Sequence, residues 1–478
     1  MKNSKTITYI SDLSFKDRDK FRQFVYSPYI NQHQKTRELL DLLLSYLDKS
    51  GQEVDMERLF GKLFPEEAFE EQKLHNLFSG LKKLYLRFLA LEELELNTLA
   101  EELLILESCN RKNFFDLLVA RARLLDKKLE EYPVRDSSFH YTRYRMRVML
   151  GYHAGTFGDR AKTSDTFQEM MDHLDRYYLA EKLRHACHLL AHSMLLNLQY
   201  DFGMLPMLVH TMAEDPAKYT SDADIEAYYT IWMSLQKDNQ DTHYLHMKKM
   251  LRDRFEALSK NAQTDLYGFA NNYCIRQINA GNSSYQGELF ELYKQGLERE
   301  LLLVNGHLSE WDYKNIATLG CSLKAFEWTE DFLESFQEKL PANRRENAYN
   351  YNLANLYYNK RQYDKVLSTL FRVQFTDVKY HLNTTFLLLR TYYAKGDVEA
   401  LYSLIDTLRV YILRNRQITV AEKKGYTNFL GFAKQLVKLK LQGPVYQRTS
   451  LESQLASLRK RIEETENVIN KYWLLEQC

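Results

Sequence analysis

Glycine and proline are scarce in this chain, with 17 glycines and 7 prolines among 478 residues. All-β and α/β folds need many tight turns, and these two residues form most of them. The apolar residues also recur every three and four positions, as Leu39, Leu40, Leu43 and Leu47 do. No segment shows a sustained alternation of apolar and polar residues. The sequence therefore predicts an all-α protein.

Charge and composition exclude several classes of protein. The formal net charge of +1 gives no overall field that would attract nucleic acid or an acidic membrane. No apolar run is long enough to span a bilayer, and residues 1–15 lack the apolar stretch of a signal peptide. The five cysteines contain no C-x-x-C pair, which argues against a zinc knuckle and a disulfide scaffold. We expect a cytoplasmic protein.

A longer period is present between residues 310 and 410. The pairs Leu319-Gly320, Leu353-Ala354 and Leu388-Leu389 are spaced 34 and 35 residues apart. This spacing is typical of tetratricopeptide repeats, in which a small residue lets the first helix of a hairpin approach the second closely. Gly396-Asp397 falls where the turn between two such helices is expected.

The predicted fold is a solenoid of antiparallel helical hairpins, tetratricopeptide-like in the C-terminal half. Stacking is required because one hairpin cannot bury its apolar face alone. Four segments are expected: an N-terminal helical subdomain at 1–95, degenerate hairpins at 96–310, tetratricopeptide-like repeats at 311–445 and a C-terminal capping helix at 446–478. Thr449 to Glu452 reads as a capping box that opens this last helix. Its apolar residues follow a heptad: Leu451, Leu455, Leu458, Ile462 and Ile469.

Several segments resemble a family of uncharacterised tetratricopeptide-like proteins from Bacteroidetes bacteria. The residues that carry the resemblance are 328–336, 345–354, 389–393, the Asn305-Gly-His-Leu-Ser309 run and the terminal Trp473-Leu-Leu475. The resemblance implies a helical-repeat fold and no particular chemistry. Asn352 and Asn355 fall where asparagines sit in members with a carboxylate clamp, whereas Tyr351 stands where such members have a lysine.

The first helices of the repeats are expected to line a concave groove that holds an extended peptide. Asparagine amides can pair with a peptide backbone through both a donor and an acceptor, and aromatic faces can take side chains. The alternative is that these aromatic residues pack between repeats. The groove positions predicted from the repeat register are Tyr351, Asn355, Tyr358, Asn359, Asn383, Phe386, Arg390 and Tyr393.

No catalytic motif is found, and we assign no catalytic residue, cofactor or metal. The chain lacks the glycine-rich phosphate loops, the G-x-S-x-G elbow and the H-E-x-x-H motif. His185, His188 and His192 would share one face of a helix, an arrangement that can bind zinc. A packing helix whose histidines bond to neighbouring helices is the preferred explanation, because no motif supplies the remaining ligand or a general base. His243 and His246 form a weaker version of the same pattern.

The C-terminal end is basic. Between Arg409 and Arg461 there are twelve Lys or Arg residues and two Glu residues. Lys434, Lys438 and Lys440 are the candidate basic patch, and scattered lysines on solvated helix faces are the alternative.

The function predicted from the sequence is a non-enzymatic scaffold that binds a peptide or partner protein in the concave groove. The alternative is a nucleic-acid-associated or regulatory helical protein that uses the basic end at 409–461. A metal-dependent helical enzyme is a third hypothesis.

Overall fold

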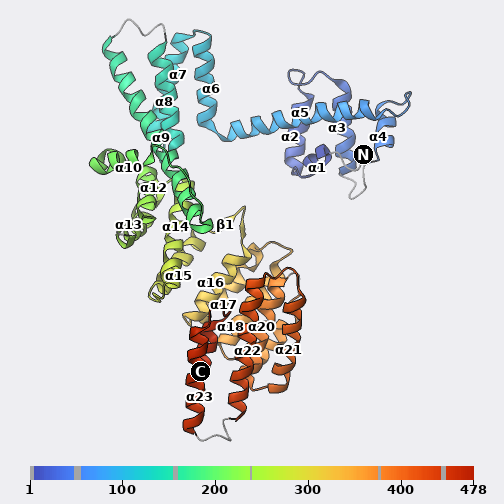
Figure 1. Ribbon diagram of the computed structural model, residues 1–478. Helices are drawn as coiled ribbons and strands as arrows, with labels where there is room; N and C mark the ends of the chain where they lie inside the picture. The colour runs from blue at the N-terminus through green and yellow to red at the C-terminus, as the bar shows by residue number, and fades with distance from the viewer. Residues whose placement is uncertain (1–4, 48–54, 154–159, 237–239, 375–377, 443–447) are drawn as a thin grey trace. The chain divides into compact units, whose positions relative to one another are not determined.

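Helices make up 79% of the chain in the structure, a computed structural model (Figure 1). The structure describes residues 5–47, 55–153, 160–236, 240–374, 378–442 and 448–478. The predicted all-α class is confirmed. In these ranges no helix has both the length and the apolar character that crossing a bilayer requires. The chain divides into two compact units, residues 1–235 with 256–259, and residues 236–255 with 260–478.

The first unit begins with five helices that share one hydrophobic core. The core includes Ile10, Phe21, Leu40, Leu63 and Leu81, all fully buried. Two of these helices start at a side-chain cap, because Ser14 and Asp55 each accept a hydrogen bond from a backbone N–H of the first turn. The helices are α1 (Lys5–Ser11), α2 (Phe15–Tyr26), α3 (Gln34–Leu47), α4 (Met56–Leu63) and α5 (Glu71–Leu96).

Seven further helices complete the first unit. A separate hydrophobic cluster, with Leu106, Leu125 and Met146 at its centre, holds the first three together. The helices are α6 (Thr98–Arg111), α7 (Phe115–Glu130), α8 (Ser137–Tyr152), α9 (Arg160–Leu196), α10 (Leu205–Glu214), α11 (Pro216–Thr220) and α12 (Ala223–Ser234).

The second unit opens with three helices and a short hairpin. The helices are α13 (Gln240–Asp253), α14 (Lys260–Asn279) and α15 (Tyr285–Glu298). Between α13 and α14 in the chain lies a 3-10 turn, η2 (Phe255–Ala257), of which residues 256 and 257 belong to the first unit. Strands β1 (Leu303–Val304) and β2 (His307–Leu308) pair antiparallel. Their connection is Asn305-Gly306, and both residues have positive φ. This dipeptide is the commonest two-residue hairpin turn, because both positions tolerate that conformation.

The remaining helices of the second unit pack against their neighbours in chain order, and several lie side by side in Figure 1. Helix α18 contacts α16, α17, α19 and α20, so its apolar residues are covered from several directions. The helices are α16 (Glu310–Ser322), α17 (Phe326–Phe336), α18 (Arg345–Asn359), α19 (Tyr363–Leu370), α20 (Val378–Lys395), α21 (Val398–Arg414), α22 (Val420–Gln442), α23 (Arg448–Glu464) and α24 (Lys471–Gln477), with a 3-10 turn, η3, at Gln337–Lys339.

Three successive helical hairpins turn through the same backbone conformation. Lys324, Arg361 and Gly396 all have a left-handed backbone, with φ of 59°, 59° and 75°. In each turn the N–H of the next residue donates to the carbonyl five residues earlier, at 2.9 to 3.0 Å. This arrangement satisfies the last carbonyls of the first helix and sets the return direction of the second. Gly396 therefore lies in the predicted turn between α20 and α21.

Gly320 sits where α16 and α17 come closest. A Cβ at this position would lie 2.3 Å from Thr329 Oγ1 of α17, which is too close for two nonbonded atoms. The predicted role of this small residue, close approach of two paired helices, matches this geometry.

The C-terminal segment differs from the single capping helix predicted from the heptad. Helix α23 begins at Arg448, before the predicted capping box, and ends at Glu464. Asn467 and Asn470 then adopt left-handed backbones, with φ of 54° and 52°, so the chain turns and starts α24. Ile469, the last heptad position, therefore lies outside both helices. The heptad pattern does not reveal this break between α23 and α24. Asparagine occurs within helices, but it also adopts a left-handed backbone more readily than most residues.

The repeated turn predicts opposite effects of two substitutions. Arg361→Gly should raise the free energy of unfolding by about 0.5 kcal/mol, because glycine adopts the left-handed backbone without steric cost. Gly396→Ala should lower it by about 1 kcal/mol for the same reason. Urea denaturation of both variants beside the unmodified chain measures the two changes. Shifts of the same sign would contradict the shared turn geometry.

Candidate functional site

A small hollow lies on the face made by α16, α18 and α20, the first helices of the three hairpins. Because each helix presents residues spaced three, four or seven apart to one side, all three contribute to the same surface. Its lining residues are Glu310, Trp311, Lys314, Tyr351, Asn352, Tyr380 and Asn383.

Aromatic rings and two charged side chains shape the hollow. The ring centroids of Tyr351 and Tyr380 lie 6.4 Å apart at 90°. The Tyr380 hydroxyl donates to Glu310 Oε2 at 3.0 Å. The ammonium of Lys314 lies 5.9 Å from the Trp311 ring centroid and 5.6 Å from that of Tyr351. Trp311 is 49% exposed, so an apolar surface of the hollow is open to solvent.

Asn352 brings an unsatisfied acceptor to this hollow. Its side chain is 1% exposed, and its Nδ2 donates to the Ala348 carbonyl at 2.8 Å. Its Oδ1 is buried without a hydrogen-bond partner in the described residues. An unmet buried acceptor costs about 1–3 kcal/mol, so the site favours a ligand that donates a hydrogen bond there.

A neighbouring asparagine shows how such an amide can hold a peptide group. The Asn347 Nδ2 donates to the Gln374 carbonyl at 3.0 Å, and its Oδ1 accepts from the Gln374 N–H at 2.9 Å. Both halves of the amide are thus used on one residue of backbone. Asn352 and Asn383 carry the same group to the hollow.

The predicted groove residues are only partly brought together. Tyr351 and Asn383 line the hollow, whereas Asn355 is 9% exposed and outside the lining. Asn359 is exposed, and its Nδ2 donates to the Asn355 carbonyl at 2.8 Å. Phe386 packs inside the core, 5.3 Å from the Tyr426 ring and 5.1 Å from the Phe429 ring.

The other three predicted residues lie beside the C-terminal helix α24. Trp473 Nε1 donates to the Tyr358 hydroxyl at 3.1 Å. The Tyr393 and Trp473 rings meet edge to face at 5.2 Å. The guanidinium of Arg390 lies over the Tyr358 ring, 5.2 Å from its centroid. This part of the predicted groove is therefore bordered by the chain's own α24.

Sequence reasoning missed the contribution of α16 to the hollow. Glu310, Trp311 and Lys314 lie within the first turns of the first helix of the first hairpin. The predicted groove positions were confined to the second and third copies. Counting from Leu319, the position equivalent to Asn383 is Lys314, whereas Glu310 and Trp311 precede every predicted groove position. Tyr380 was missed because it precedes the predicted groove positions of α20.

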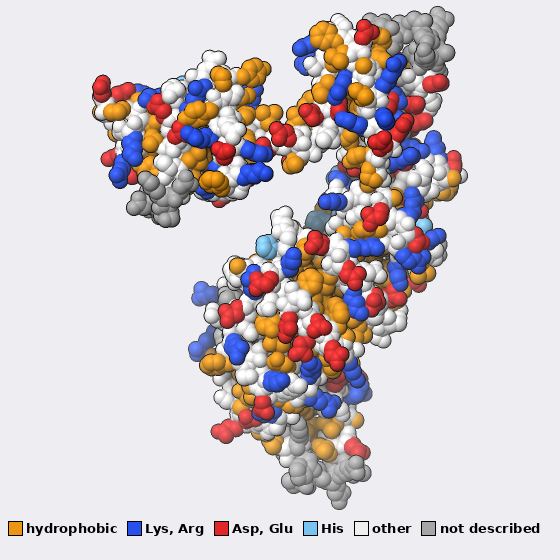
Figure 2. Space-filling model, turned by 180° about the vertical axis from the view of Figure 1, so that it is seen from behind, with side chains coloured by type: hydrophobic (Ala, Val, Ile, Leu, Met, Phe, Trp, Pro, Cys, Tyr) orange, Lys and Arg blue, Asp and Glu red, His pale blue; other side chains and the backbone are white. Residues whose placement is uncertain are grey.

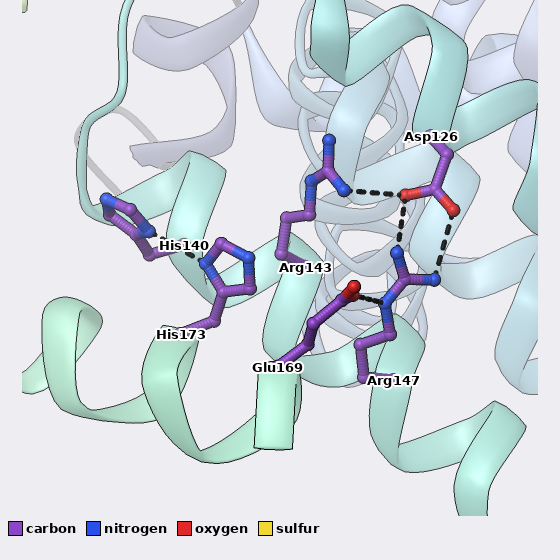
Figure 3. A network of polar contacts seen from close by, with 6 residues as sticks. All are labelled: Asp126, His140, Arg143, Arg147, Glu169 and His173. Carbon is purple, nitrogen blue, oxygen red and sulfur yellow. Dashed lines mark hydrogen bonds and ion pairs between the residues drawn. The ribbon is translucent and has the colours of Figure 1, made fainter. Parts of the chain in front are cut away.

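A second polar cluster ties α7, α8 and α9 together in the first unit (Figure 3). Asp126 accepts hydrogen bonds from Arg143 at 2.9 Å and from Arg147 at 3.0 and 3.1 Å. Arg147 also donates to Glu169 of α9. These hydrogen bonds therefore link α7, α8 and α9.

A buried histidine, His140, and a half-buried one, His173, adjoin this cluster. His140 Nδ1 lies 3.0 Å from His173 Nδ1, so one ring must donate and the other accept (Figure 3). Burial lowers the pKa of His173 to about 3, and the nearby His140, Arg143, Arg147 and Arg176 add to the effect. On the other side of His140, Nε2 lies 3.5 Å from Asp222 Oδ2.

The buried carboxylate of Asp224 has a raised pKa, whereas the pKa of His173 is lowered. Asp224 is 4% exposed and accepts hydrogen bonds from Ser259 through both its backbone N–H and its hydroxyl. Burial raises the pKa of Asp224 to about 6, although the bonds from Ser259 lower it.

The histidines considered as zinc ligands lie on the exposed side of α9. His185 Nε2 is 3.3 Å from Glu181 Oε2, and His192 Nδ1 is 2.8 Å from the Tyr200 hydroxyl. His188 is also exposed. In the described ranges, no three His, Cys, Asp or Glu side chains gather closely enough to hold a metal ion. His243 and His246 lie on α13, where burial lowers the pKa of His243.

The candidate basic patch is spread along α22. Lys434 Nζ lies 3.2 Å from Asp406 Oδ1, and Lys438 is exposed. The side chain of Lys440 lies outside the described residues. Farther along, Arg459 pairs with Glu463 at 3.2 Å. Figure 2 shows acidic and basic side chains interspersed over the C-terminal part on the face in view.

Comparison with protein-family models, with curated proteins and with solved structures found no match for this chain.

The lowered pKa of His173 predicts how the free energy of unfolding depends on pH. The ordinary pKa of His173 is 6.5 and its folded value is about 3, so the unfolded chain binds this proton first. The free energy of unfolding should therefore fall below pH 6.5, by up to about 1.4 kcal/mol per pH unit. His173→Gln should remove this loss, so the variant should gain on the unmodified chain as the pH falls from 6.5 to 4. Urea denaturation at several pH values measures the difference.

A second variant checks that the effect is specific to His173. Asp224 has a raised pKa, so its protonation favours the folded state, and its contribution to stability is lost as the pH rises toward 6. The stability advantage of Asp224→Asn over the unmodified chain should therefore shrink as the pH falls through 6. Parallel curves for the two variants would contradict both assignments.

Proposed function

We propose that the protein is a non-enzymatic scaffold whose second unit binds a peptide segment of a partner protein in the hollow on α16, α18 and α20. In this proposal the three hairpins are a tetratricopeptide-like stack within a helical solenoid that works in the cytoplasm. The resemblance to the Bacteroidetes family remains a prediction from the sequence, and this proposal does not depend on it.

One observation carries the proposal: the buried, unpartnered Asn352 Oδ1 at a hollow that also holds Asn383 and exposed aromatic surface. A peptide N–H is the group that such an acceptor requires, and the Asn383 amide can pair with a neighbouring peptide unit. The Trp311 and Tyr380 rings offer apolar surface to a peptide side chain. The backbone contact that Asn347 makes with Gln374 supports this use of an amide.

The proposal predicts that binding and stability separate at Asn352. Asn352→Leu removes the unmet acceptor and has a similar volume, so the melting temperature should stay the same or rise. The same variant should bind peptides at least tenfold more weakly, because the ligand N–H loses its partner. Asn383→Ala should also weaken binding at least tenfold.

The measurement is a selection of random 12-residue display peptides on the immobilised protein, followed by the Kd of the enriched peptides for each variant. Asn359→Ala is the matched control, since it removes an exposed amide from α18 outside the hollow and should leave Kd unchanged. The proposal would be contradicted if neither Asn352→Leu nor Asn383→Ala changed the Kd of the enriched peptides. A large fall in melting temperature for Asn352→Leu would mean that this amide serves packing.

A further inference from the structure

Arg390 is unlike the other arginines with a buried Nε. Seven arginines in the described residues have a buried Nε without a hydrogen-bond partner. Six of them use another guanidinium nitrogen in a hydrogen bond or an ion pair: Arg18 with Ser11, Arg37 with Asn31, Arg121 with Glu102, Arg143 with Asp126, Arg145 with Glu107 and Arg345 with Glu338. Within the described residues, Arg390 forms neither a hydrogen bond nor an ion pair, and its contact is with the Tyr358 ring.

Among the residues that the structure describes, no carboxylate lies within ion-pair distance of this guanidinium. Arg390 is partly buried, and the Tyr358 ring beneath it is fixed by the bond from Trp473 to its hydroxyl. Desolvating a charge without a partner is costly, and an arginine fork pairs best with a carboxylate through two parallel hydrogen bonds. The position is therefore suited to receive a carboxylate from outside the chain.

Arg390 lies on the same face of α20 as Asn383, which lines the hollow. Asn383 and Arg390 are seven residues apart on α20, which puts them on one face and about 10.5 Å apart along the axis. Tyr351 and Tyr358 repeat this spacing on α18. The charge of Arg390 reaches both tyrosines, because it offsets part of the rise in pKa that burial causes in each.

We propose that the peptide bound in the hollow carries an aspartate or glutamate whose carboxylate pairs with Arg390. This inference rests on the proposed function, and it adds the chemical class of the partner segment. An extended peptide advances about 3.3 Å per residue, so the acidic side chain lies about three residues from the one that enters the hollow. Helix α24 borders the surface beyond Tyr358 and limits how far the peptide extends.

The experiment uses the full chain and the peptides enriched from the random 12-residue library. We expect an Asp or Glu at the stated spacing from an apolar residue. Arg390→Gln should weaken such a peptide at least tenfold, whereas the same peptide with its acid changed to the amide should bind both proteins equally. Arg414→Gln is the matched control, since it removes an exposed positive charge from α21 and should change Kd less than twofold.

The outcomes distinguish the failure of the acidic class from the failure of the proposed function. Peptides that depend on Asn352 and Asn383 but bind equally to Arg390→Gln overturn the acidic class and leave the proposed function in place. Peptides that depend on neither asparagine overturn both. If Arg390→Gln loses its fold by circular dichroism, Arg390→Lys replaces it: the charge is kept and the fork is lost, so acidic peptides should bind several-fold more weakly. Unchanged binding by that variant would overturn the pairing.

Discussion

Helices α16 to α21 each pack against the helix that follows, so the direction in which the chain returns after a turn decides which apolar residues are covered. That direction is set in the turns at Lys324, Arg361 and Gly396, which share a left-handed backbone and the same hydrogen bonds. The close approach of α16 and α17 at Gly320 depends on the return direction as well. The hollow on α16, α18 and α20 follows, because repeated turns put equivalent helices on one face.

The polar groups of that face differ in how far the rest of the chain satisfies them. Asn347 uses its whole amide on the backbone of Gln374, and Tyr380 is bonded to Glu310. Asn352 and Arg390 retain unmet hydrogen-bonding capacity in partly or fully buried positions. Burial without a partner is costly, so these two residues are the ones that packing explains least.

The fold class could be predicted from the sequence, but the turns and the site only in part. Gly396 marks its turn because glycine favours a left-handed backbone, whereas Lys324 and Arg361 occupy the same conformation without any residue-type signal. The register of α18 and α20 put Tyr351 and Asn383 on one face, and both line the hollow. It could not show that Phe386 is covered by α22, or that α24 borders Tyr393, because those contacts join segments 40 to 80 residues apart.

The contact between Trp473 and Tyr358 also has a consequence for biosynthesis. Trp473 and Leu474 are buried with Leu389, Phe429 and Ile405 in one core. Chains fold from the N-terminal end as they are synthesised, so this core stays incomplete until residue 474 has emerged. Until then the nascent chain exposes the aromatic rings that Trp473 later covers. A chain shortened before Trp473 therefore exposes apolar surface of this core, and such surface promotes aggregation.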